Sequence, residues 1–164
     1  MNKENSVTGR VLEIQRMSTE DGPGLRTSVF LKGCPLACTW CHNPESIPKS
    51  PQVQWIESRC IGCLTCVKVC PLEALSAQEK GIIIDKEKCD GCGICTQECP
   101  TLAMELLGKI WTADELLYEI AKDRAYFDQS GGGITITGGE PLVQREFTLE
   151  LLRGCQENRL HTAL

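Results

Sequence analysis

Residues 34–41 read Cys-Pro-Leu-Ala-Cys-Thr-Trp-Cys, three cysteines in a C-x3-C-x2-C spacing that follows directly on the mainly apolar residues 27–32. Three thiolates can bind three irons of a [4Fe–4S] cube, whereas an electron-transfer cluster is held by four. The spacing therefore predicts a cluster in which one iron has no protein ligand. Such an open iron is a position where chemistry can take place.

Two other interpretations of this stretch stay open on spacing alone. Cys38-Thr39-Trp40-Cys41-His42 also satisfies the C-x-x-C-H signature of a covalently attached haem. That interpretation requires an exported chain, and residues 1–10 show no apolar signal-peptide core. A zinc site built from Cys34, Cys38, Cys41 and His42 is the stronger alternative.

Composition limits the class of protein. The 164 residues are 41% apolar, enough for a core, so the twelve cysteines are not needed as disulfide staples. We expect a cytoplasmic protein whose thiols bind metal. The apolar runs are shorter than the ~20 residues of a membrane span, and a net charge of −5 gives no argument for nucleic acid. No membrane and no nucleic-acid partner are expected.

The residues before the cysteine loop predict two strands. Residues 7–17 alternate apolar and polar over much of their length, as in a half-exposed strand, and residues 26–32 form a buried one. Between them, Asp21-Gly22-Pro23-Gly24 has the composition of a type II turn, and such a turn can also line a site. The cysteine loop follows the end of the second strand, where α/β folds place active sites.

An internal repeat occupies the middle of the chain. Four cysteines recur 29 residues later, each quartet is followed by proline, and strand-like runs at residues 53–56 and 82–84 precede them. The spacing matches the two-cluster ferredoxin run C-x2-C-x2-C-x3-C-P, whose fourth cysteine binds the other cluster. Paired zinc sites are the alternative. On the ferredoxin precedent, the two ligand sets are Cys60, Cys63, Cys66 and Cys99, and Cys89, Cys92, Cys95 and Cys70.

The C-terminal part reads as helix, strand, helix. A capping box at residues 112–115 begins an apolar helical stripe that the glycines at 131–133 end. Residues 134–137 predict a strand, residues 146–157 a second helix with Cys155 buried on its apolar face, and residues 161–164 the start of the next strand.

The second of these strands ends in Gly138-Gly139-Glu140-Pro141. The stretch contains neither of the glycine-rich phosphate-binding patterns. Two glycines at a strand end would let a ligand lie against the backbone, and the Glu140 carboxylate could bind an ammonium group.

These motifs resemble those of the radical S-adenosylmethionine superfamily, through C-x3-C-x2-C with Trp40 before its third cysteine and through Gly-Gly-Glu after the next strand. Within it the chain resembles the glycyl-radical-enzyme activating enzymes, the pyruvate formate-lyase activase group, in the subgroup with an inserted two-cluster domain. The supporting segments are residues 21–24, 41–46, 130–133 and 138–142.

The resemblance implies a set of roles. Cys34, Cys38 and Cys41 would bind the catalytic cluster, and Gly138, Gly139 and Glu140 would hold the amino group of S-adenosylmethionine on its open iron. Reductive cleavage would give methionine and a 5′-deoxyadenosyl radical, which takes a hydrogen from a backbone glycine of a partner enzyme. Residues 21–24 would lie near that glycine. The two other [4Fe–4S] clusters would pass electrons inward from a flavodoxin or ferredoxin, and the protein would act as an anaerobic monomer.

The fold implied is α/β: the N-terminal portion of a partial (β/α) radical-SAM barrel with an inserted α+β ferredoxin domain. The expected divisions are residues 1–49, the insert 50–108, and 109–164. The chain holds only two barrel strands and the beginning of a third, so we expect a C-terminally truncated barrel that binds clusters poorly and does not turn over. Cleavage of S-adenosylmethionine by these 164 residues at a normal rate would contradict that expectation.

Two other functions remain as alternatives to the activase. One is a ferredoxin-like electron carrier in which only the eight-cysteine segment works. The other is a radical enzyme that modifies a small molecule.

Overall fold

A computed structural model describes residues 6–164, and the chain divides into two compact units. Unit 1 combines the residues up to Lys49 with Gly108–Leu164, and unit 2 is Ser50–Leu107. The polypeptide therefore leaves unit 1 after the cysteine loop and returns to it after the second cysteine quartet.

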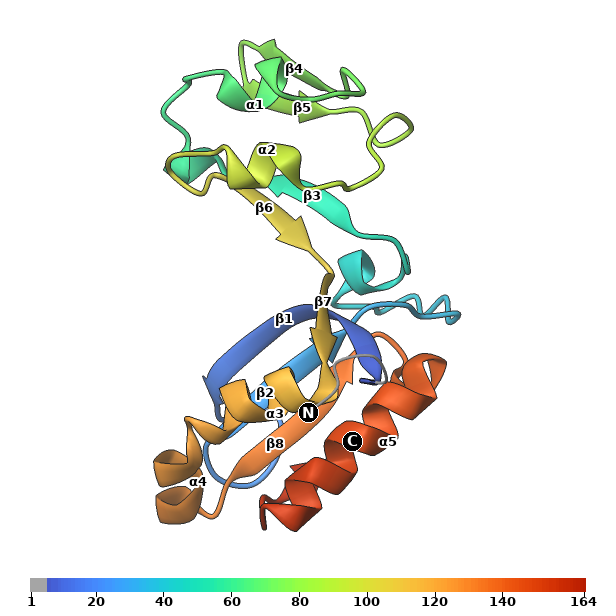
Figure 1. Cartoon of the computed structure of the whole chain (residues 1–164), viewed down its shortest axis with the longest axis vertical. Helices are drawn as coiled ribbons and strands as arrows, with labels where there is room; N and C mark the ends of the chain where they lie inside the picture. The colour runs from blue at the N-terminus through green and yellow to red at the C-terminus, as the bar shows by residue number, and fades with distance from the viewer. Residues whose placement is uncertain (1–5) are drawn as a thin grey trace. The chain divides into compact units, whose positions relative to one another are not determined.

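Unit 1 is built on a mixed five-stranded sheet (Figure 1). The strands β2, β8 and β9 are parallel to one another, and β1 lies antiparallel to both β2 and β7. In spatial order the strands are β7 (Lys109–Thr112), β1 (Thr8–Ser18), β2 (Arg26–Leu31), β8 (Gly133–Gly138) and β9 (Thr162–Ala163).

The alternation of side chains in the strands gives the sheet one apolar face. Val29 and Leu31 of β2 and Ile134 and Ile136 of β8 are buried in the main core, while the residues between them point to the other face. Helices cover the apolar face, and α3 and α5 also pack against each other (Figure 1). The helices of unit 1 are α3 (Ala113–Ala121), α4 (Arg124–Ser130) and α5 (Arg145–Glu157).

The predicted capping box is confirmed at the start of α3. The backbone N–H of Glu115 donates to Thr112 Oγ1 at 3.1 Å, and the backbone N–H of Thr112 donates to Glu115 Oε2 at 3.2 Å. Two otherwise unpaired donors of the first turn are thereby satisfied. The two strands before the cysteine loop, the strand that ends in Gly138, and the helix with buried Cys155 are confirmed as well.

The prediction of a single helix up to the glycines at 131–133 is wrong. The helix stops at Ala121 and a new one begins at Arg124. The cause lies at Asp123, which is 6% exposed and whose carboxylate accepts hydrogen bonds from Arg16 and, at 2.8 Å, from Thr27 Oγ1. The chain breaks its helix there because the carboxylate is turned toward the strands.

Unit 2 repeats its backbone as well as its cysteines. Its two antiparallel strand pairs are β3 with β6 and β4 with β5, and the two registers correspond under the 29-residue offset. Left-handed conformations also recur 29 residues apart, for example at Leu64 and Gly93, which precede the equivalent helices. Its elements are β3 (Gln52–Trp55), η3 (Glu57–Arg59), α1 (Thr65–Lys68), β4 (Leu75–Gln78), β5 (Gly81–Ile84), α2 (Ile94–Gln97) and β6 (Met104–Leu107).

The coarse expectation of a mixed α/β protein is confirmed by these elements. In the described part of the chain, residues 6–164, none of the helices combines the length and the apolar character needed to cross a bilayer.

Candidate functional site

The cysteine loop and the Gly-Gly-Glu segment begin side by side at one edge of the unit 1 sheet. Leu31, the last residue of β2, lies opposite Gly138, the last residue of β8. Past the strand ends, Gly139 N–H donates to Leu31 O at 2.8 Å and Glu140 N–H donates to Gly33 O at 3.0 Å. The structure therefore brings these two predicted segments together at the carboxyl ends of parallel strands.

Glycines permit this close approach of the two backbones. A Cβ added to Gly139 would lie 2.5 Å from the carbonyl oxygen of Gly33. Gly138 has φ of +92°, a left-handed conformation that side chains disfavour. Gly139 makes a close backbone contact and Gly138 has a left-handed conformation, so a larger residue at either position would disturb both strand ends.

The Glu140 carboxylate is held in place by the turn that follows it. Its Oε1 accepts a hydrogen bond from Leu142 N–H at 3.1 Å and caps η4 (Pro141–Gln144). An ionised carboxylate has about four acceptor positions, so this cap leaves capacity for a ligand. The arrangement suits the recognition of an ammonium group.

The three cysteines of the loop are accessible to a cluster. Cys34 is half-buried, and Cys38 and Cys41 are exposed. A turn closes between the last two, since Cys41 N–H donates to Cys38 O at 3.2 Å. Trp40 between them is 76% exposed. The loop presents its thiols at the surface of the described chain, with one of them anchored at the strand end.

Lys32 supports the chain that returns from this loop, a role that the sequence did not suggest. It is 1% exposed, and its Nζ donates to Glu45 O at 2.5 Å. Burial lowers the pKa of this ammonium group below its ordinary value. Cys34 N–H donates to Ile47 O at 3.0 Å nearby. The segment with η2 (Pro44–Ser46) is thereby fastened to the end of β2.

Gln144 is a second supporting residue that sequence reasoning missed. Its Nε2 donates to Lys32 O at 2.9 Å and to Arg10 O at 2.8 Å, and its Oε1 accepts from Arg10 N–H at 2.6 Å. One amide thus ties the turn after Gly-Gly-Glu to β1 and β2. These partners are more than 100 residues away in the chain, and no local pattern signals them.

The structure does not bring the Asp21–Gly24 turn to the cysteine loop. The turn precedes β2 and the cysteines follow it, and six extended residues span about 20 Å. The Asp21 carboxylate accepts from Ser18 Oγ at 2.6 Å and Ser28 Oγ at 2.5 Å, and these hydrogen bonds lower its pKa. Gly24 has the left-handed φ, +68°, that the turn prediction required.

Arg26 holds the same turn from within the sheet. It is fully buried, and its guanidinium donates to Pro23 O at 3.2 Å and to Thr135 Oγ1 at 2.6 Å. Burial lowers its pKa. The turn is therefore a rigid feature at the amino end of the parallel strands.

In unit 2 the cysteines gather around two small pockets. Each pocket is lined by three cysteines of one repeat and the fourth cysteine of the other. The lining cysteines are Cys60, Cys63, Cys66 and Cys99 in one pocket, and Cys70, Cys89, Cys92 and Cys95 in the other. Four thiols around a pocket, with apolar residues between them, are a suitable donor set for a [4Fe–4S] cluster.

Among residues 6–164, no three His, Cys, Asp or Glu side chains are grouped as they would be around a single metal ion. The thiolate ligands of one zinc ion all lie about 2.3 Å from it. The ligands of a cube instead bind separate irons, so a cube does not need that grouping.

The environments of the thiols differ within each pocket. Burial raises the pKa of Cys66, and it raises that of Cys95 to about 11. Hydrogen bonding from Thr65 lowers the pKa of Cys63. Burial acts to raise the pKa of Cys99, but hydrogen bonds from residues 101–104 outweigh it and leave a lowered value.

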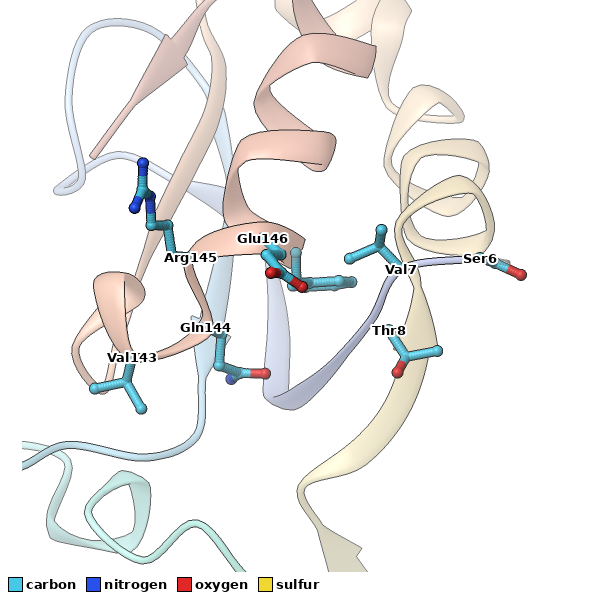
Figure 2. A pocket seen from close by; sticks show the side chains of 8 residues that line it. Ser6, Val7, Thr8, Val143, Gln144, Arg145 and Glu146 are labelled. Carbon is cyan, nitrogen blue, oxygen red and sulfur yellow. The ribbon is translucent and has the colours of Figure 1, made fainter. Parts of the chain in front are cut away.

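A cleft of about 710 Å³ lies elsewhere in unit 1, between the start of β1 and the turn into α5 (Figure 2). Its lining is mainly polar and contains no cysteine. The predicted site residues do not line it, but it adjoins the site through Val143, whose N–H donates to Glu140 O at 3.0 Å, and through Gln144. The lining residues are Ser6, Val7, Thr8, Val143, Gln144, Arg145, Glu146 and Phe147.

Comparison with protein families gives a match to the 4Fe-4S single cluster domain over residues 20–163. The matched range includes the cysteine loop, both quartets and the Gly-Gly-Glu segment.

Similar proteins are named as activating enzymes. The (2S)-3-sulfopropanediol dehydratase activating enzyme of Klebsiella oxytoca is 42% identical, over 97% of this chain and 52% of its own length. The trans-4-hydroxy-L-proline dehydratase activating enzyme of Clostridioides difficile is 44% identical, over 94% and 51%. The benzylsuccinate synthase activating enzyme of Thauera aromatica is 46% identical, over 94% and 48%.

These relatives confirm the resemblance to activating enzymes that the motifs indicated. The chain spans about half the length of the curated relatives it matches.

Proposed function

The chain belongs to the family of 4Fe-4S single cluster domains, and from this premise we propose that the protein is an activating enzyme for a glycyl radical enzyme. It would use S-adenosylmethionine and one electron to place a radical on a glycine of its protein partner. The similarity to several named activating enzymes supports this assignment.

One observation carries the proposal. Gly139 and Glu140 are joined by backbone hydrogen bonds of 2.8 Å and 3.0 Å to Leu31 and Gly33, directly before the three-cysteine loop begins at Cys34. Cys34, Cys38 and Cys41 would hold a cluster on that loop, and the Glu140 carboxylate would offer an acceptor for an ammonium group from the neighbouring strand end. The two halves of a site for a chelating amino acid would therefore begin from adjacent strand ends.

The residues would have the following roles. Cys34, Cys38 and Cys41 would bind three irons, and Gly138 to Glu140 would hold the amino group of S-adenosylmethionine. When bound, the cluster and S-adenosylmethionine would supply the reactivity: one electron would break the C5′–S bond to give methionine and a 5′-deoxyadenosyl radical, which would take a hydrogen from the partner's glycine and become 5′-deoxyadenosine. The protein orients these groups, while the cofactor supplies the reactivity.

The Asp21–Gly24 turn would contact the partner at a distance from the reacting glycine. About 20 Å of strand separates the turn from the cysteine loop. If the partner's glycine reaches the cluster, the partner residues that contact this turn would therefore lie several positions away from that glycine in the partner's sequence. Its rigid attachment through Arg26 and Asp21 suits such a docking role.

Unit 2 would serve as an inserted two-cluster ferredoxin domain at residues 50–108. Its two pockets hold the cysteine sets expected for cross-ligated clusters. A flavodoxin or ferredoxin would donate the electrons. Residues 1–49 and 109–164 would form the N-terminal portion of a partial barrel. We expect a cytoplasmic monomer in which the 164 residues alone have little activity.

Three measurements on the full-length protein test this function. Anaerobic iron counting should give about twelve irons, and about eight would favour an electron carrier. 5′-Deoxyadenosine should form on reduction with S-adenosylmethionine. A glycyl-radical EPR doublet should then appear on a candidate partner. Formation of deoxyadenosine without that doublet on any candidate partner would favour a radical enzyme that acts on a small molecule.

Cross-ligation can be tested with one cysteine. Replacing Cys99 by serine is expected to remove or convert the cluster whose other ligands are Cys60, Cys63 and Cys66, because Cys99 lines their pocket. Iron counting should fall by up to about four irons, with one EPR signal changed. Cys155→Ala is the matched control, since this buried cysteine lies in the core of unit 1. A Cys99→Ser signal identical to that of the unsubstituted protein would contradict the ligand assignment.

A further inference from the structure

The two cysteine pockets of unit 2 occupy equivalent positions in the repeat but differ in polarity. Several lining residues correspond closely, such as Ala103 with Ala74 and Met104 with Leu75. Other positions differ in their hydrogen-bonding capacity or charge. Since the clusters would share one backbone framework, these differences are the source of any inequality between them.

Two of the differences provide hydroxyl groups to one pocket alone. Thr101 Oγ1 lies 3.8 Å from Cys99 Sγ, and its equivalent in the other pocket is Leu72. Thr65, two residues after Cys63, also carries a hydroxyl, whose hydrogen bonding lowers the pKa of Cys63, and its equivalent is Ile94. The pocket lined by Cys60, Cys63, Cys66 and Cys99, here termed pocket A, therefore has two hydroxyls beside its thiols.

The third difference places a negative charge beside the other pocket, termed pocket B and lined by Cys70, Cys89, Cys92 and Cys95. Asp90 lines pocket B, and its Oδ1 accepts a hydrogen bond from Cys92 N–H at 2.9 Å. The equivalent residue in pocket A is Ile61, which is apolar. The Asp90 carboxylate is held beside a ligand cysteine and accepts the hydrogen bond of the Cys92 N–H. In pocket A the side chain of Ile61 cannot accept such a bond.

All three differences act in the same direction on a reduction potential. Hydrogen bonds to cluster sulfurs and less negative surroundings favour the reduced, more negative cluster. A fixed carboxylate nearby and the loss of a donor disfavour it. Pocket A has the first kind of environment and pocket B the second.

We propose that the cluster in pocket A has the higher reduction potential, so that the first electron to reach unit 2 resides there. In that step a one-electron donor is oxidised and the pocket A cluster goes from the 2+ to the 1+ state. The pocket B cluster accepts an electron only from a stronger reductant. This inference rests on the proposed function, because it requires a cluster in each pocket.

The test is an EPR-monitored redox titration of the full-length protein with dithionite, in a Cys38→Ala background that removes the signal of the third site. Cys63→Ser and Cys92→Ser assign the two remaining signals to pockets A and B. The signal of pocket A should appear first on reduction, at a higher potential than that of pocket B.

Charge and hydroxyl variants then test the cause. Asp90→Asn keeps an acceptor for Cys92 N–H and should raise the potential of pocket B, with a roughly tenfold change in its reduced-to-oxidised ratio, about 59 mV for one electron. Ile61→Asp should lower the potential of pocket A, with a change of similar size in its reduced-to-oxidised ratio. Thr65→Val and Thr101→Val should each lower the reduced-to-oxidised ratio of pocket A severalfold.

Asp85→Asn is the matched control for the loss of a carboxylate. Asp85 accepts hydrogen bonds from Glu87 and Lys88 in the same unit but lines neither pocket, so it should shift either ratio less than twofold. Equal potentials, the reverse order, or an Asp90→Asn shift no larger than that of the control would each overturn the inference. If both clusters are present with equal potentials, the proposed function stands and only this inference fails. If iron counting shows no clusters in unit 2, this inference fails together with the proposed ferredoxin role of unit 2.

Discussion

Replacement of Cys38 by alanine is expected to abolish the formation of 5′-deoxyadenosine in the full-length protein while the clusters of unit 2 remain. Cys38 is an exposed thiol at the middle position of the three-cysteine loop. Without it the cube has only two protein ligands, and a site-differentiated cluster needs three. Deoxyadenosine should be measured by chromatography after reduction, and iron should fall from about twelve to about eight.

The matched control for this variant is Cys155→Ala. Cys155 is also a cysteine of unit 1, but it is fully buried between helix and sheet, and burial raises its pKa to about 11. It should keep the iron content and the deoxyadenosine yield, with some loss of stability from the smaller side chain. Deoxyadenosine at an undiminished rate in Cys38→Ala would remove the three-cysteine loop from the reaction.

Gly139→Ala is expected to disrupt the second half of the site. The new Cβ would lie 2.5 Å from the carbonyl oxygen of Gly33, a backbone atom that cannot rotate away. The strand ends would have to separate, at a cost of about 2–3 kcal/mol in unfolding free energy. A misplacement of about 1 Å at a reacting centre lowers turnover on the order of 100-fold. Denaturant unfolding and deoxyadenosine yield measure the two effects.

Gly131→Ala is the control that separates damage to the S-adenosylmethionine site from a general loss of stability. A Cβ at Gly131 meets nothing within 4 Å, although its φ of +67° is left-handed. The substitution should therefore destabilise the fold by about 1 kcal/mol and leave the binding of S-adenosylmethionine unchanged. Calorimetric titration with S-adenosylmethionine distinguishes the two variants. Equal affinities for it in Gly139→Ala and Gly131→Ala would show that Gly139 does not shape its site.

Much of the local structure could be predicted because its causes lie within a few residues. The capping box at Thr112 and the strand that ends in Gly138 depend on near neighbours, and both appear where they were expected. The strand β7 was missed, because Lys109–Thr112 is a short edge strand whose Ile110 is 63% exposed. It exists through pairing with β1, about 100 residues earlier.

The candidate site could be predicted in part for the same reason. The cysteines of residues 34–41 and the segment Gly138–Glu140 are recognisable from residue type and spacing. Both segments begin at the same sheet edge because β2 pairs in parallel with β8. The supporting residues Lys32 and Gln144 carry no such signal, since what marks them is burial and hydrogen bonds to distant backbone atoms.

The sequence by itself determined which side chains could serve as ligands: three thiols in one loop, two quartets in a 29-residue repeat, and a carboxylate after paired glycines. Residue type and short spacing decide such features, because a tight loop needs few residues. Only the tertiary structure decided that Gln144 ties the turn after Gly-Gly-Glu to the backbone of Arg10 and Lys32. It also decided that α3 stops where Asp123 meets Arg16 and Thr27. Contacts between residues about 100 positions apart form only when the chain is folded, and no local pattern encodes them.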